Sequence, residues 1–129
     1  MADSCVVTNE YGKVVIGKPV ILQIVSEVVE ETVGVRLASF KEMLKKRKSS
    51  IDVSFDSDGQ PEINVFVVVD FGTSISNATY NIINEVKNRT MTVLDRPPSG
   101  VNVTVVATQT KKNKAKRNIK IRRSYDISE

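Results

Sequence analysis

The sequence predicts an α+β fold, a two-layer sandwich in which both helices lie on one mixed or antiparallel sheet. Residues 63–71 place apolar side chains on both faces of one extended segment, which is typical of a central strand covered on both sides. Residues 19–33 and 75–93 repeat apolar side chains every three or four positions, the period of an amphipathic helix. With the shorter alternating runs between them, the expected order is strand, helix, three strands, helix, strand.

Composition sets the expected boundaries of this fold. The chain has 129 residues, of which 40% are apolar and 26% charged, as in an ordinary globular protein of one domain. Residues 1–10 are expected to be a flexible N-terminus, residues 11–109 a single α+β domain, and residues 110–129 a basic flexible tail.

The first predicted helix follows a short strand at residues 11–16. Pro19 suits the first position of a helix, and Gly34 is placed to end it. The many β-branched residues favour a strand locally, but the spacing of the apolar residues favours a helix. The expected apolar face consists of Val20, Ile21, Ile24, Val25, Val28, Val29 and Val33.

Three strands and a second helix are expected next. Residues 35–40 predict a strand, residues 41–50 a basic connection, and residues 51–55 a half-exposed strand. Residues 56–61 have the composition of a hairpin turn, so this strand should pair antiparallel with the central one. After the second helix, residues 101–108 predict the closing strand. The expected apolar face of that helix consists of Ile75, Ala78, Thr79, Ile82, Ile83, Val86 and Val93.

Turn residues surround the central strand and the second helix. Gly72 ends the strand, and Ser74 is placed to cap the helix. A strand–glycine–helix junction can bind an anion through free amides, but no phosphate-binding motif is present, so a structural turn at residues 70–72 is the preferred interpretation. Residues 56–59 resemble half of a calcium loop without its distal glutamate, and a plain hairpin turn is again preferred.

Histidine is absent, and the chain has one cysteine, Cys5. The absence of histidine removes the commonest general base and the commonest metal ligand. The carboxylates of Glu27, Glu30 and Glu31 are explained by a solvated helix face. We therefore assign no catalytic, cofactor-binding or metal-binding residue. A lone thiol fits a reducing compartment. We see neither a secretion signal nor an apolar run near the ~20 residues of a membrane span, so a cytoplasmic protein is expected.

The formal net charge of +4 is concentrated near the C-terminus. Residues 111–129 contain eight basic and two acidic residues and carry +6, whereas residues 1–110 carry −2. This segment could bind nucleic acid or an anionic surface, without sequence selectivity because only Tyr125 could stack on a base. The candidate contacts with anionic partners are Lys111, Lys112, Lys114, Lys116, Arg117, Lys120, Arg122 and Arg123.

Residues 12–35 and 63–108 together resemble the alkaline-shock-protein family of bacterial envelope stress response proteins. The resemblance is most specific at Gly34-Val35, Phe71-Gly72 and Val101-Asn102-Val103. It implies a small, cytoplasmic, non-enzymatic protein of cell-envelope homeostasis that acts through protein–protein interaction, in some members tethered to the membrane through a partner. It implies no small-molecule substrate and no catalytic residues. Self-association through free sheet edges is a further prediction, and nucleic-acid or anionic-surface binding is the alternative function.

Overall fold

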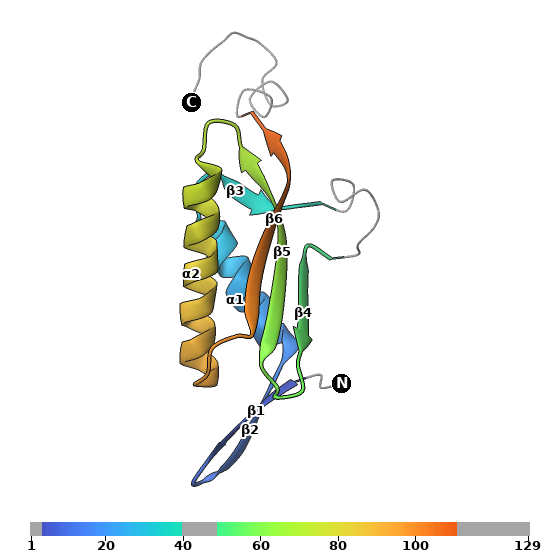
Figure 1. The fold of residues 1–129 in the computed structure, drawn as a ribbon, viewed down its shortest axis with the longest axis vertical. Helices are drawn as coiled ribbons and strands as arrows, with labels where there is room; N and C mark the ends of the chain where they lie inside the picture. The colour runs from blue at the N-terminus through green and yellow to red at the C-terminus, as the bar shows by residue number, and fades with distance from the viewer. Residues whose placement is uncertain (1–3, 40–48, 111–129) are drawn as a thin grey trace.

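The computed structural model describes residues 4–39 and 49–110, and its fold is α+β as predicted. Two helices lie on the same face of a four-stranded sheet, and a separate two-stranded hairpin projects beyond this sandwich (Figure 1). The elements in chain order are β1 (Ser4–Asn9), β2 (Gly12–Gly17), α1 (Lys18–Glu31), β3 (Val35–Leu37), β4 (Ile51–Phe55), β5 (Pro61–Asp70), α2 (Ile75–Leu94) and β6 (Gly100–Gln109).

β5 is the central strand of a mixed sheet. β6 runs parallel to β5 along one edge. On the other edge, β4 pairs antiparallel with residues 61–65, and β3 pairs antiparallel with residues 67–69. The strand predicted at residues 35–40 is therefore shorter than expected, and its last predicted position, like most of the basic connection after it, lies outside the described residues.

The main core lies between the sheet and the helices. On β5, the side chains of Ile63, Val65, Val67 and Val69 are 0% exposed and pack against both helices. Full burial of such a side chain contributes about 1.5–3 kcal/mol. The face of β4 that points the same way is also buried, as its alternating sequence predicted.

The opposite face of β5 differs from the prediction that the strand is covered on both sides. Val68 is buried and Phe66 half-buried, and both pack with Ala38, Val106 and Ala107 in a small second cluster. β6 has one extra residue here, because Val67 pairs with Val105 and Val68 pairs with Ala107. This β-bulge turns Val106 and Ala107 toward the same cluster. No described helix covers this face, which we call the open face.

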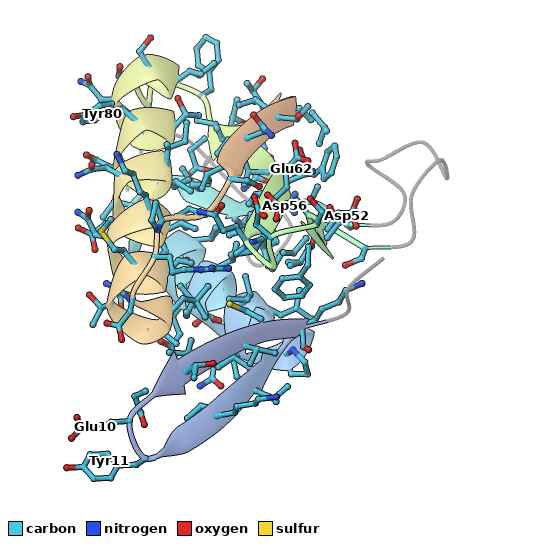
Figure 2. All side chains as sticks on the ribbon, turned by 60° about the horizontal axis from the view of Figure 1, so that its bottom comes forward. Glu10, Tyr11, Asp52, Asp56, Glu62 and Tyr80 are labelled. Carbon is cyan, nitrogen blue, oxygen red and sulfur yellow. The ribbon has the colours of Figure 1, made fainter. Side chains whose placement is uncertain are left out.

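The prediction of a flexible N-terminus is wrong for residues 4–9, because β1 pairs with β2 in a hairpin. Cys5 lies opposite Ile16 and is 0% exposed, so its thiol is part of the core rather than of a flexible end. The physical reason is that Cys5 and Val7 alternate toward the core, an alternation too short to be recognised without its partner strand. Glu10 and Tyr11 project at the tip of the hairpin (Figure 2).

Both helices form where the sequence predicted them, but the prediction that Val20 and Val33 belong to the buried face of α1 is wrong. Val20 is 40% exposed, and Val33 lies beyond the end of α1 and is 86% exposed. α1 is helical despite its β-branched residues, because five of its apolar side chains are buried on one face. In α2, the prediction that Ile75 and Val93 belong to the buried face is wrong, since they are 45% and 41% exposed. The buried residues recur every four positions, so the contact stripe is inclined to the helix axis. They are Ala78, Ile82, Val86, Thr90 and Leu94.

Candidate interaction site

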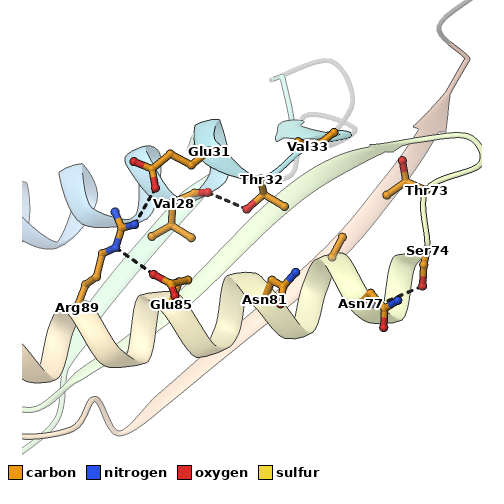
Figure 3. Close-up of a pocket in the computed structure, with 11 residues that line it drawn as sticks. Val28, Glu31, Thr32, Val33, Thr73, Ser74, Asn77, Asn81, Glu85 and Arg89 are labelled. Atoms are coloured by element: carbon orange, nitrogen blue, oxygen red, sulfur yellow. Dashed lines mark hydrogen bonds and ion pairs between the residues drawn. The ribbon is translucent and has the colours of Figure 1, made fainter.

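A groove of about 490 Å³ lies between the C-terminal end of α1 and residues 77–89 of α2 (Figure 3). We call it the interhelical groove. Its lining combines apolar side chains with hydroxyl, carboxamide and charged groups. The lining residues are Val28, Glu31, Thr32, Val33, Thr73, Ser74, Asn77, Ala78, Asn81, Glu85 and Arg89.

One end of the groove is built by the turn after α1. The Thr32 hydroxyl donates to the carbonyl of Val28 at 2.8 Å, and the backbone N–H of Asp70 donates to the carbonyl of Gly34 at 2.7 Å. Gly34 has a φ of +83°, and a Cβ there would lie 2.4 Å from the Thr73 hydroxyl oxygen. Only glycine combines this positive φ with the lack of a Cβ atom that the contact with Thr73 requires. The end of α1 is therefore held directly against the turn that leads into α2.

The wall of the groove on α2 begins at the predicted cap. Ser74 Oγ accepts a hydrogen bond from the backbone N–H of Asn77 at 3.3 Å. Asn77 and Asn81 follow one turn apart, and both line the groove (Figure 3). Their side-chain amides make no hydrogen bond to any described residue. Each carboxamide offers both donors and an acceptor, the groups that recognise peptide bonds.

The other end of the groove is closed by Arg89. Its Nη2 donates to Glu31 Oε1 at 2.7 Å, and its Nε donates to Glu85 Oε1 at 3.3 Å, so one guanidinium joins the two helices (Figure 3). The hydrogen bond with Glu31 is the main reason that the pKa of Arg89 is raised above its ordinary value. Two carboxylates and one guanidinium leave this end with a formal charge of −1. Sequence analysis did not predict this contact between residues 58 positions apart.

Large apolar side chains are exposed on the turns beside the groove. Val33 is 86% exposed, and Phe71 is 74% exposed. The backbone N–H of Phe71 donates to the carbonyl of Gln109, so β6 ends next to this turn. A groove with apolar and hydrogen-bonding groups and exposed apolar neighbours is suited to binding another polypeptide.

The structure gives the other described candidates from the sequence a role in turns or in the sheet. Asp56 Oδ1 accepts from the backbone N–H groups of Asp58 and Gln60, both at 2.9 Å, so residues 56–60 form the predicted hairpin turn. The Asp70 carboxylate accepts from Gln109 Nε2 at 3.0 Å, which gives it a structural role in joining β5 to β6. The eight basic candidate contacts between Lys111 and Arg123 lie outside the described residues.

Membrane-spanning helices and clusters of metal ligands are both absent from the described part of the chain. Neither of its helices combines the length and apolar character needed to cross a membrane. Among the same residues, no three histidine, cysteine, aspartate or glutamate side chains are grouped as metal ligands would be.

The fold and the groove define a small α+β protein with a candidate polypeptide-binding site. Residues 6–110 match the family of alkaline shock protein 23, which is described by a cell envelope-related function. The chain therefore belongs to this family, as its sequence patterns predicted, and the family is not known to be catalytic. No curated protein and no solved structure gives a significant match to the chain.

Proposed function

We propose that the protein is a non-catalytic interaction module that acts in cell-envelope homeostasis from the cytoplasm. In this proposal, a protein partner, membrane-associated or not, binds in the interhelical groove. The observation that carries the proposal is the groove itself, in which Asn77 and Asn81 present carboxamides without described partners beside the exposed side chains of Val33 and Phe71.

The test uses two double variants of one helix. Asn77→Lys with Asn81→Lys places two large cations in the groove, whereas the outer variant, Ser76→Lys with Tyr80→Lys, places two cations at the same spacing on exposed positions of α2 that do not line the groove. We expect a protein that co-purifies with the wild type and with the outer variant to be lost from the groove variant in quantitative affinity capture. Identical sets of captured proteins would contradict a partner site in the groove.

A second candidate function is binding of anionic surfaces or nucleic acid by the basic tail. It is favoured by the distribution of charge, because the described residues contain six basic and eleven acidic side chains and carry −5. The positive charge therefore lies in the residues outside them. Full-length protein and a chain ending at Thr110 should differ in binding to anionic vesicles and random RNA, and the difference should decrease with salt. Equal binding by the two proteins would show that the tail does not bind these anionic partners.

A further inference from the structure

The β1–β2 hairpin carries apolar side chains that the rest of the described molecule leaves uncovered. It joins the core at its base, through Cys5 and Ile16, and then projects beyond the sandwich (Figure 1). Nearer its tip, Val14 is 50% exposed and Val15 is 64% exposed, although their side chains lie on opposite faces of the strand. A two-stranded hairpin without further packing is marginally stable in water. This hairpin is therefore a candidate surface for contact with another polypeptide.

The register of the hairpin shows which of its backbone groups are free to bind. Asn9 and Gly12 flank a two-residue turn, and residues in this position form a hydrogen-bonded pair. Every second pair along the ladder is then hydrogen-bonded, and the pairs between them direct their N–H and carbonyl groups to the outer edges. Lys13 and Val15 thus present donors and acceptors on the outer edge of β2. None of the described strands pairs with this edge.

Among the described sheet edges, the outer edge of β2 is the best suited to pairing with a further strand. Residues 12–15 of β2 are all exposed, whereas three of the six residues of β1 are buried or half-buried. In the main sheet, β3 and β4 are only three and five residues long, and β4 carries Asp52. β6 is interrupted by its bulge. Short length, charge and bulges all hinder pairing at an edge.

A second copy of the chain fits the edge of β2 in an antiparallel register with a two-fold axis at Val14. Lys13 then lies opposite Val15 of the second copy, so that free backbone groups meet free backbone groups. The same register brings Glu10 of each copy near Lys18 of the other, and both side chains are exposed (Figure 2). Opposite charges across neighbouring strands stabilise their pairing. β1 contains no charged residue, so pairing through β1 would leave Glu10 without this partner.

This register also covers the apolar side chains of the hairpin. On one face, Val14 packs against Val14 of the second copy. On the other face, Val15 lies against the aliphatic part of the second copy's Lys13. Tyr11 is 90% exposed at the tip, and it lies opposite Gly17 of the second copy, which has no side chain to oppose the ring.

We propose that the chain forms a dimer in which β2 pairs antiparallel with β2 of a second copy, so that the two hairpins make one sheet. The interhelical groove lies at the C-terminal end of α1, whereas β2 leads into its N-terminal end. The dimer therefore leaves both grooves accessible and presents two equivalent partner sites. The pairing goes beyond the proposed function and does not depend on it.

Disulfide cross-linking of the full-length protein tests the register. Opposite residues that share no hydrogen bond have Cα atoms about 4.5 Å apart, a separation that permits a disulfide. Val14→Cys should form a disulfide-linked dimer under mild oxidation, seen by non-reducing gel electrophoresis, and the buried Cys5 offers no competing thiol. Val6→Cys is the control, because Val6 is 45% exposed but would lie about 14 Å from its counterpart, three strand spacings away. Equal cross-linking of the two variants, or none at Val14, would overturn the proposal.

Proline variants test the edge without disrupting the hairpin. Val15→Pro removes an outward N–H but no hydrogen bond of the β1–β2 ladder, so the protein should fold and the dimer should be lost. Val6→Pro makes the same change on the outer edge of β1 and should leave the dimer intact. Sedimentation over a concentration series measures both, because an interface of one strand pair is small and should dissociate on dilution. Wild-type protein that stays monomeric, or a dimer that Val15→Pro does not weaken, would refute the pairing.

Charge reversal tests the predicted contact between the copies. Glu10→Lys should weaken the dimer, Glu10→Lys with Lys18→Glu should restore it, and both effects should decrease with salt. A double variant as weak as the single one would contradict the register. Asn77→Lys with Asn81→Lys should dimerise like the wild type, so loss of a groove partner and loss of the dimer are distinguishable.

Discussion

The two faces of β5 show how differently one strand can use adjacent residues. Val67 is 0% exposed between the sheet and two helices, whereas its neighbour Phe66 is half-buried on the open face. Both are apolar, and both would be assigned to a core from sequence alone. The difference is that two helices cover one face, while the described residues give the other face only a small cluster. Hydrophobicity therefore identifies a central strand without identifying which face is covered.

The largest expected effect comes from placing the same charge on each face. Val67→Asp should prevent folding, because an unpaired carboxylate in the core has no water and its cost takes most of a typical stability of about 5–15 kcal/mol. Phe66→Asp should fold with reduced stability, since the carboxylate can reach solvent. Circular dichroism during thermal unfolding measures both. A cooperatively folded Val67→Asp protein would show that Val67 does not lie in a dry core.

A smaller effect extends the comparison to α2. Ile82 is 0% exposed and Ile75 is 45% exposed, although both belong to the apolar face predicted from sequence. Ile82→Ala should cost about 2–5 kcal/mol because it leaves a cavity, whereas Ile75→Ala should cost well under that amount. Urea denaturation gives both values. Equal losses would mean that Ile75 packs in the core in solution.

Thr90 offers a test in the stabilising direction. Its side chain is 0% exposed, and its hydroxyl has no hydrogen-bond partner among the described residues. Thr90→Val keeps the shape and removes the unpaired hydroxyl, so it should raise stability by about 1 kcal/mol. Thr92→Val, on the exposed side of α2, is the control and should have little effect. A lower melting temperature for Thr90→Val would show that the hydroxyl is hydrogen-bonded.

The smallest effect on stability is expected at the solvent-exposed ion pairs of Arg89, which join the two helices. Arg89→Gln removes the contacts with Glu31 and Glu85, but exposed ion pairs add little, so the melting temperature should change slightly and the change should shrink with salt. The pKa of Arg89 is raised in the folded protein, so its contribution is complete below the ordinary pKa and is lost only as pH rises through the higher folded value. The difference between the two proteins should therefore stay constant from neutral to moderately alkaline pH. A steep change over that interval would assign the effect to another group.

Much of the architecture could be predicted because it depends on short-range patterns. The apolar run of β5, the three-to-four spacing in both helices and the cap at Ser74 are properties of neighbouring residues, and the structure confirms each of them. β1 was missed because only Cys5 and Val7 turn toward the core, and a strand that short depends on its partner β2. The groove was missed because its parts come from two helices separated by about a third of the chain. Asn77 and Asn81 lie outside the apolar face predicted for the second helix, but their position opposite α1 is not local information.

The sequence by itself determined the two helices, the central strand and the fold class, since periodic burial and turn chemistry depend on residues close in the chain. Its resemblance to known sequences indicated the family. The tertiary structure decided which residues share a site. Glu31 meets Arg89, and Gly34 lies against Thr73, only because the two ends of the helices are brought together by a shared sheet. It also decided that Phe66 and Val67, adjacent and equally apolar, occupy different environments, because coverage of a strand depends on where the helices pack.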